Sequence, residues 1–168
     1  MTQVVVWVSE GTWQGCVDAA ARFAPRDAEF TLLHVTDAEI AAVASGAFDG
    51  LLGRDRHDPG DAVRELAGPA EQGLLADAAR RLGRPAGLEV RTGAVEREVV
   101  AACADADLLV CARDGSHDRL GPHSLGHHTR FVVDHAPCAV LLVWPDQVPG
   151  LDSIPPKPPH PPHHPTRP

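Results

Sequence analysis

Short apolar runs recur along the chain, with longer amphipathic segments between them. Four of the five runs hold almost no polar residue, which is typical of strands in a parallel sheet that helices cover on both faces. The third run alternates apolar and polar residues and indicates an exposed edge strand. The five predicted strands are 4–8, 30–35, 88–92, 108–111 and 139–143.

The segments between the runs predict helices. The first follows Thr12 as its N-cap and has an apolar stripe at helical spacing, formed by Trp13, Val17, Ala20 and Ala24. Two more are predicted at 95–104 and 124–135, and Pro137 ends the second of these. This alternation predicts right-handed β-α-β units, and therefore an α/β fold with a doubly wound, five-stranded parallel sheet. The ligand crevice of such a sheet lies beyond the carboxyl ends of its strands.

The link between the second and third strands, residues 36–85, is long enough to hold more than one element. We predict a short helix near 38–44, a loop near 48–61 and a helix that ends at Leu82. The pair Gly68-Pro69 is expected to interrupt or restart this last helix. Proline lacks the N–H donor and disfavours helical geometry in the residue before it.

Composition narrows the class of protein. A chain of 168 residues with 43% hydrophobic residues suits one domain with its own core. The formal net charge of −8 repels phosphate backbones, so a nucleic-acid partner is not expected. The apolar run at the amino terminus has only a strand's length and no basic segment, which predicts neither a signal peptide nor a membrane span. The four cysteines show no C-x-x-C spacing, which favours reduced, mostly structural thiols in a cytoplasmic protein.

Residues 147–168 form a Pro- and His-rich tail, which we predict to be extended and disordered, outside an α/β domain at 1–146. His160, His163 and His164 could bind a soft divalent ion weakly, but an extended tail gives them no fixed geometry. We therefore interpret the tail as a solvated appendage.

Many of the candidate functional residues lie between the fourth and fifth runs, in the loop 113–129. A glycine-bearing loop that leaves a buried strand and enters a helix favours anion binding, because the first N–H groups of the helix lack partners. A zinc cluster is an alternative, but Pro122 and Gly126 break the helical register that it would need, so no metal site is predicted. The residues of this alternative are His117, Asp118, His123 and His127.

No catalytic signature accompanies this loop. The serines have no G-x-S-x-G context, no carboxylate pair stands out, and the sequence holds no G-x-x-x-x-G-K-[ST] phosphate loop. A nucleotide hydrolase would need a general base near the phosphate, for which His123 or His127 is the local candidate. We therefore expect a binding protein and not an enzyme.

The most distinctive run is Asp-His-Ala-Pro-Cys-Ala-Val-Leu-Leu-Val at 134–143, preceded by the apolar stretch 101–113 and the glycine loop. In the amino half, Glu10-Gly-Thr12 follows the first run and Leu32-Leu-His-Val35 lies in the second. Over about 4–143, these residues resemble the universal stress protein family.

The resemblance implies strand order 3-2-1-4-5, a homodimer formed through the last strand, Ala139–Val143, and a regulatory role in the stress response. It also implies ATP, with Mg²⁺, as a ligand in the nucleotide-binding branch. That branch has two glycines separated by two residues, then nine residues, then Gly-Ser or Gly-Thr. Here Gly126 matches the last glycine, while Arg113 and Ser116 replace the first two and His127 replaces the hydroxyl residue. The loop is therefore a degenerate form of the motif.

Two hypotheses remain open from this resemblance. In the first, the domain is a nucleotide-responsive regulator that binds ATP or a related nucleotide in the crevice. In the second, the site has decayed and the fold is a dimeric protein-interaction module, whose partner surface is the loop 48–61 or the tail. The predicted nucleotide-binding residues are Glu10, Gly11, Thr12, Val35, Arg113, Gly115, Ser116, Gly126, His127, His128 and Thr129.

Overall fold

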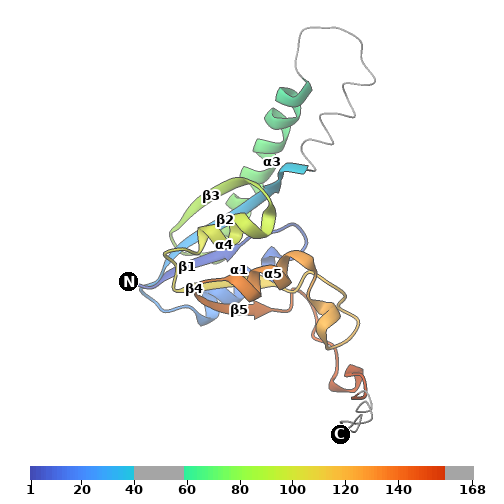
Figure 1. Cartoon of the computed structure of the whole chain (residues 1–168). Helices are drawn as coiled ribbons and strands as arrows, with labels where there is room; N and C mark the ends of the chain where they lie inside the picture. The colour runs from blue at the N-terminus through green and yellow to red at the C-terminus, as the bar shows by residue number, and fades with distance from the viewer. Residues whose placement is uncertain (40–58, 158–168) are drawn as a thin grey trace, which may run out of the picture.

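A five-stranded, all-parallel sheet forms the centre of the computed structural model, which describes residues 1–39 and 59–157 (Figure 1). The strand order is β3-β2-β1-β4-β5, which confirms both the predicted α/β class and the order implied by the resemblance. The strands are β1 (Gln3–Trp7), β2 (Glu29–Asp37), β3 (Ala86–Gly93), β4 (Leu108–Ala112) and β5 (Ala139–Val143).

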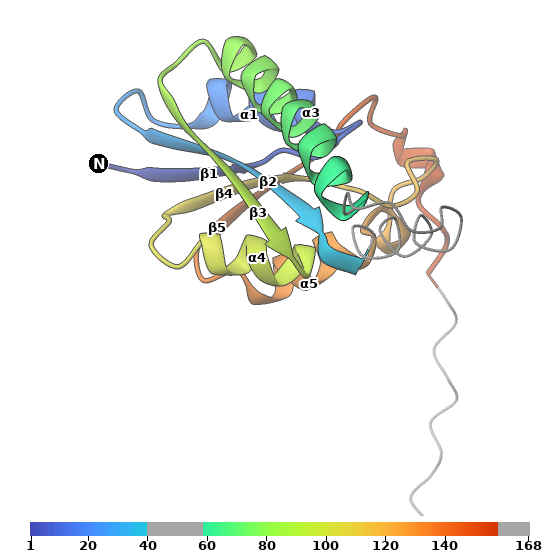
Figure 2. The ribbon, with the colours of Figure 1, turned by 90° about the horizontal axis from the view of Figure 1, so that it is seen from above.

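Helices cover both faces of the sheet, as Figure 2 shows. Helices α1 (Trp13–Phe23) and α3 (Pro59–Leu82) pack on one face, and α4 (Val95–Ala102) and α5 (His127–His135) pack on the other. Successive β1 side chains therefore enter two different cores. Val4 and Val6 contact the first core, and Val5 and Trp7 the second. This double burial explains why the central runs are continuously apolar.

Helix α3 passes through Gly68 and Pro69 without a break, so the predicted interruption is wrong. A proline in a helix interior costs about 3 kcal/mol, because it removes one hydrogen bond and crowds the preceding turn. Downstream of the proline, Leu75, Ala78 and Leu82 are buried against the sheet. Burying a leucine side chain contributes about 1.5–3 kcal/mol, so tertiary packing offsets the local penalty.

The predicted helix start agrees with the structure at α1 but not at α5. Thr12 does occupy the N-cap position of α1, but its side chain makes no capping bond, and its Oγ1 donates to the Ser9 carbonyl oxygen at 3.4 Å. Helix α5 begins at His127, because Leu125 is extended and separates it from a 3-10 turn, η1 (Pro122–Ser124). The predicted helix 38–44 and loop 48–61 lie largely outside the described residues.

Beyond β5 the chain is not uniformly extended. Leu151–Ser153 form a 3-10 turn, η2, and the Leu120 N–H donates to Ser153 Oγ at 3.0 Å. The first part of the predicted tail is thereby attached to the loop that follows β4. Within the described ranges, no helix combines the length and the apolar character needed to cross a membrane.

Three of the four cysteines are buried in the two cores. Burial raises the pKa of the Cys16 and Cys111 thiols to about 12. Burial, followed by the proximity of Cys138, likewise raises the pKa of Cys103 to about 12. These thiols are therefore protonated at neutral pH and act as small hydrophobic groups.

Candidate functional site

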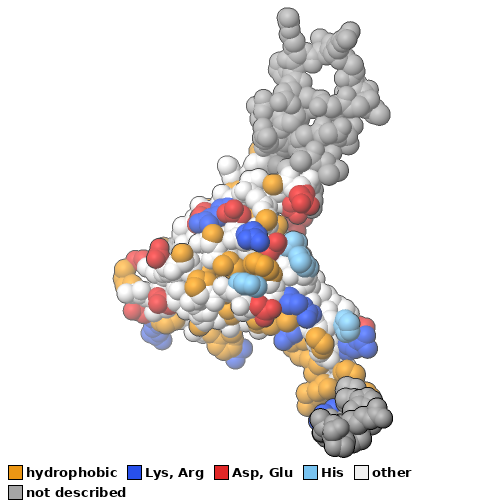
Figure 3. All heavy atoms as spheres, viewed as in Figure 1, with side chains coloured by type: hydrophobic (Ala, Val, Ile, Leu, Met, Phe, Trp, Pro, Cys, Tyr) orange, Lys and Arg blue, Asp and Glu red, His pale blue; other side chains and the backbone are white. Residues whose placement is uncertain are grey.

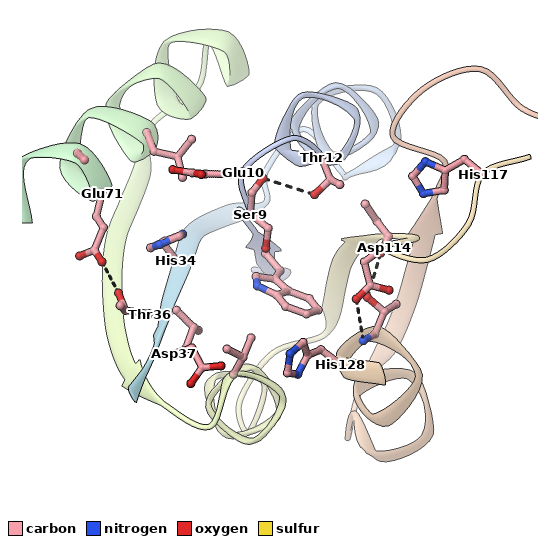
Figure 4. Close-up of a pocket in the computed structure, with 17 residues that line it drawn as sticks. Ser9, Glu10, Thr12, His34, Thr36, Asp37, Glu71, Asp114, His117 and His128 are labelled. Carbon is pink, nitrogen blue, oxygen red and sulfur yellow. Dashed lines mark hydrogen bonds between the residues drawn. The ribbon is translucent and has the colours of Figure 1, made fainter. Parts of the chain in front are cut away.

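A cavity of about 680 Å³ opens at the carboxyl ends of β1, β2 and β4 (Figure 4). The strand order reverses at β1, and the loops that leave the neighbouring strands diverge there, which is where doubly wound sheets bind ligands. The volume falls within the usual range for small-molecule sites, about 300–1,000 Å³. The apolar part of the wall consists of Trp7, Val35, Ala70, Leu74, Val95 and Ala112.

The turn after β1 supplies one polar edge of the cavity. The Ser9 carbonyl oxygen accepts the N–H groups of Thr12 and Trp13 at 3.2 and 3.1 Å. Gly11 has a φ of +78°, a conformation that glycine adopts without steric cost. Ser9, Glu10 and Thr12 line the cavity, whereas Gly11 shapes the turn.

The end of β2 supplies the opposite edge, where it meets α3. Val35 is buried and lines the cavity beside His34, whose Nδ1 donates to the Val8 carbonyl oxygen at 2.8 Å. Thr36 Oγ1 donates to the Glu71 carboxylate on α3, as Figure 4 shows. Asp37 completes this edge.

Asp114 lies two residues after β4, and its carboxylate occupies the amino terminus of α5. Its Oδ1 accepts the Gly126 N–H at 2.7 Å. Its Oδ2 lies 3.4 Å from the Thr129 N–H (Figure 4). Thr129 is buried, and its Oγ1 donates to the Ala112 carbonyl oxygen at 3.1 Å, which anchors α5 to the end of β4. An internal carboxylate thus takes the position at the helix terminus where an external anion would be stabilised.

The remainder of the loop after β4 is closed on itself. The Gly115 N–H donates to the Ser124 carbonyl oxygen at 3.0 Å, and the Ser116 N–H to the His123 carbonyl oxygen at 2.9 Å. A Cβ on residue 115 would lie 2.3 Å from the His123 carbonyl oxygen, so only glycine fits. These amides are already satisfied and are not free to bind phosphate.

Arg113 points toward the carboxyl-terminal end of β5. Its guanidinium carbon lies 4.7 Å from the ring centre of Trp144, and a terminal N–H donates to Ser124 Oγ. Its Nε is buried and has no partner among the described residues. Trp144 also meets the ring of His117 edge-on, at 5.8 Å between ring centres. Of these three side chains, only His117 lines the cavity.

The end of the cavity that His128 lines lies where α4 meets α5. His128 lines the cavity, and its Nδ1 lies 2.7 Å from Glu96 Oε2. Glu96 accepts its own backbone N–H in the first turn of α4, and this bond, followed by the bond to His128, lowers the pKa of its carboxyl group. At neutral pH the Glu96 side chain is therefore a carboxylate, about 16% exposed.

The eleven predicted site residues fall into two groups. Those that line the cavity are Glu10, Thr12, Val35, His128 and Thr129. Those outside its lining are Gly11, Arg113, Gly115, Ser116, Gly126 and His127. Ligand binding by any of them stays a prediction.

Sequence reasoning missed several lining residues, of which Trp7, His34, Asp37 and Asp114 are examples. Asp37 ends β2 and Asp114 lies two residues beyond β4, so their position after an apolar run was an available signal, whereas Trp7 and His34 lie inside their runs. No sequence pattern marked Glu71 and Leu74 on α3, because only the folded structure brings this helix to the cavity.

The comparisons with known proteins agree with this geometry. The model of the Universal stress protein family matches residues 2–143. No curated protein matches the chain. Solved structures that share the fold include the hypothetical protein MJ0577, with a TM-score of 0.62 and 17% identity over 85% of this chain and 95% of that one.

Two further structures share the fold. The hypothetical protein PH0823 has a TM-score of 0.60 and 18% identity, over 86% of this chain and 98% of that one. A universal stress protein in complex with cAMP has a TM-score of 0.56 and 18% identity, also over 86% of this chain and 98% of that one. The family model covers most of the sequence, and the sheet order is the one implied by the resemblance. The chain therefore belongs to the universal stress protein family.

Proposed function

We propose that the chain is a regulatory domain of the stress response that binds an adenine nucleoside, or an adenine nucleotide with little phosphate charge, in this cavity. Size and wall chemistry support the proposal, because an apolar pocket with a few polar groups suits a flat base and a hydroxylated sugar. A structural neighbour of the same family was solved in complex with cAMP, a nucleotide with a single phosphate group.

The base would lie against the apolar wall. Trp7 and Val35 come from adjacent strands and Val95 from α4, and all three line the cavity. Aromatic rings of a ligand and a protein attract each other beyond the area that they bury, by about 0.5–1.5 kcal/mol. The ribose hydroxyl groups would donate to carboxylates that line the cavity, such as those of Glu10 and Asp37.

The proposed preference for a ligand with little phosphate charge rests on the described part of the loop after β4, which has no arrangement of free N–H groups to bind phosphate. Asp114 already caps α5, and the amides of Gly115 and Ser116 are bonded within the loop. No lysine or arginine stands among the described cavity-lining residues, whereas four carboxylates do: Glu10, Asp37, Glu71 and Asp114. A triphosphate would meet these negative charges without compensation from a basic side chain among the described lining residues. We therefore propose that ATP with Mg²⁺, the ligand implied by the resemblance, is not the preferred ligand.

The test compares three ligands on the full chain: adenosine, cAMP, and ATP with and without Mg²⁺. Binding is followed by equilibrium dialysis and by tryptophan fluorescence, to which Trp7 contributes from the cavity lining. We expect saturation by adenosine and cAMP, with weaker binding of ATP whether or not Mg²⁺ is present. Tighter binding of ATP than of adenosine would contradict the low-charge proposal. Failure of all three to saturate at millimolar concentration would leave the alternative, a dimeric protein-interaction module.

A pair of tryptophan substitutions on α3 ties the signal to the cavity. Ala70 is exposed and lines the cavity, so Ala70→Trp should fill it and prevent binding. Gln72 is exposed on the same helix outside the lining, so Gln72→Trp is the matched control and should bind normally. Equal binding by the two variants would place the ligand elsewhere.

A further inference from the structure

Three side chains with metal-ligating atoms come together where α4 meets α5. Glu96 lies in the first turn of α4, and His127 and His128 begin α5. One carboxylate oxygen and one ring nitrogen from each histidine all lie within 4.8 Å of one another. In the part of the chain that the structure describes, no other group of three such residues is this close. It is not the set weighed from the sequence, because only His127 is common to both.

The packing of the two helices fixes this arrangement. Val99 of α4 and Val132 of α5 are fully buried in the same core, about one helical turn beyond the three side chains. Leu125 and Gly126 are extended, so α5 starts at His127 and places two consecutive histidines at its first positions. The rings of His127 and His128 stand 5.4 Å apart at an angle of 67°.

One hydrogen bond accounts for the close approach of only two of the three side chains. Glu96 and His128 are joined at 2.7 Å, which satisfies both. One ring nitrogen of His127 lies within 4.8 Å of the other two groups, a position that this bond does not require. His127 is exposed, so an ion can reach the group from solvent. Figure 3 shows exposed histidine side chains near acidic ones on the face of the molecule that carries α4 and α5.

Two imidazoles and one carboxylate form a donor set that suits Zn²⁺ and other borderline divalent ions. Zinc takes nitrogen ligands at about 2.0–2.1 Å and oxygen ligands at about 2.0–2.2 Å, commonly with a fourth position open to water. Bonds of that length around a tetrahedral ion separate the ligand atoms by about 3.3 Å. Small side-chain rotations therefore bring a group that spans at most 4.8 Å onto one ion. Mg²⁺ prefers oxygen ligands and suits this set poorly.

We propose that Glu96, His127 and His128 bind one divalent transition metal ion of the zinc type, with the fourth position held by water or by an anionic oxygen. His128 also lines the cavity, so the ion would lie at its edge. The proposal does not depend on nucleotide binding, because the three ligands belong to the protein itself. The ion would also join α4 to α5, so its binding should raise the unfolding temperature.

The test uses the full chain with His160, His163 and His164 replaced by Gln, so that histidines of the tail cannot contribute. Zinc is titrated by calorimetry in competition with a chelator of known affinity, and Mg²⁺ is titrated in parallel. We expect one zinc per chain and no comparable binding of Mg²⁺. Co²⁺ in place of zinc should give visible absorption bands of a low-coordinate site without a thiolate charge-transfer band.

Single substitutions then identify the ligands. Glu96→Gln, His127→Gln and His128→Gln should each weaken zinc binding by about 100-fold or more, because even loss of a hydrogen-bonding partner of a ligand costs about 10- to 100-fold. His135→Gln, at the other end of α5, is the matched control and should bind as the parent does. His127 is exposed, so its variant should fold normally, which circular dichroism without metal checks. Absence of saturable zinc binding, or binding that survives His127→Gln and His128→Gln, would overturn the proposal.

Discussion

A single side chain, that of Asp114, occupies the amino terminus of α5, where an external anion would otherwise bind. Its carboxylate accepts the Gly126 N–H at 2.7 Å and adds a negative charge to the cavity. Asp114→Ala should therefore raise the affinity for ATP by about tenfold, an effect of about 1.4 kcal/mol, and leave adenosine binding nearly unchanged. The lost cap should lower the free energy of unfolding by about 1 kcal/mol.

The matched control is Asp118→Ala, which removes the same charge from the same loop. Asp118, unlike Asp114, does not cap α5. Asp118 accepts a hydrogen bond from Ser116 and does not line the cavity. Its variant should show neither the gain in ATP affinity nor the loss of the cap. A null result for Asp114→Ala in calorimetric titration would mean that the carboxylate is not what excludes phosphate.

Gly115 is the residue on which closure of the loop depends. A Cβ there would lie 2.3 Å from the His123 carbonyl oxygen and 2.8 Å from the Ser124 carbonyl carbon, both of which are backbone atoms that cannot rotate away. Gly115→Ala should therefore destabilise the fold by about 1–3 kcal/mol, the usual cost of overpacking, measured by urea unfolding. Gly73→Ala is the control, because a Cβ there has no neighbour within 4 Å. In a helix interior that change should stabilise by about 0.5–1 kcal/mol.

Between elements, α1 and α3 are joined by a two-point ion pair. Arg81 Nε and one terminal nitrogen each lie 2.7 Å from an Asp18 carboxylate oxygen. The hydrogen bond from Arg81 holds the pKa of Asp18 below its usual value. Because the folded-state pKa is the lower one, the stabilising effect is present above the unfolded-state pKa of about 3.9 and is lost as the pH falls through the folded-state value.

Asp18→Asn should therefore lower the unfolding midpoint slightly at pH 5–7, and the difference from the parent should shrink below about pH 4. The effect should be small, because both side chains are about half exposed. Urea unfolding across this pH range measures it. Arg81→Gln should remove the same increment, and the double variant should be no worse than either single one. Additive losses would show that the two residues act separately.

The strands and helices could be predicted from the sequence where the burial of apolar side chains alone determines them. Continuous apolar runs identified the sheet, and alternation in 88–92 marked β3, where Leu88 and Val90 are 52% and 42% exposed. The helix across Pro69 was predicted wrongly, because local propensity says nothing of the burial that holds α3 in place. The group around His127 escaped for a related reason. Glu96 is distant in sequence from the two histidines, so only the packing of α4 against α5 brings the three side chains together.

At the scale of the whole molecule, the two edges of the sheet differ in a way that favours one interface. On β3, Glu89 and Arg91 form an ion pair that discourages pairing with another strand. The β5 edge carries only apolar side chains, and Val140 through Val143 are half-buried. An open apolar edge of this kind is seldom left uncovered in soluble proteins. We therefore expect a homodimer that forms through β5.

Leu142→Lys tests this dimer, because a symmetric interface would then bury two like charges. Light scattering at about 10 μM should give the mass of a dimer for the parent chain and that of a monomer for the variant, since like charges in an interface cost several kcal/mol. Val90→Lys places the same charge on the exposed face of β3 and should leave the dimer intact. A monomeric parent, or dimers that tolerate Leu142→Lys but not Val90→Lys, would assign the interface to another surface. Circular dichroism of both variants ensures that loss of the dimer is not loss of the fold.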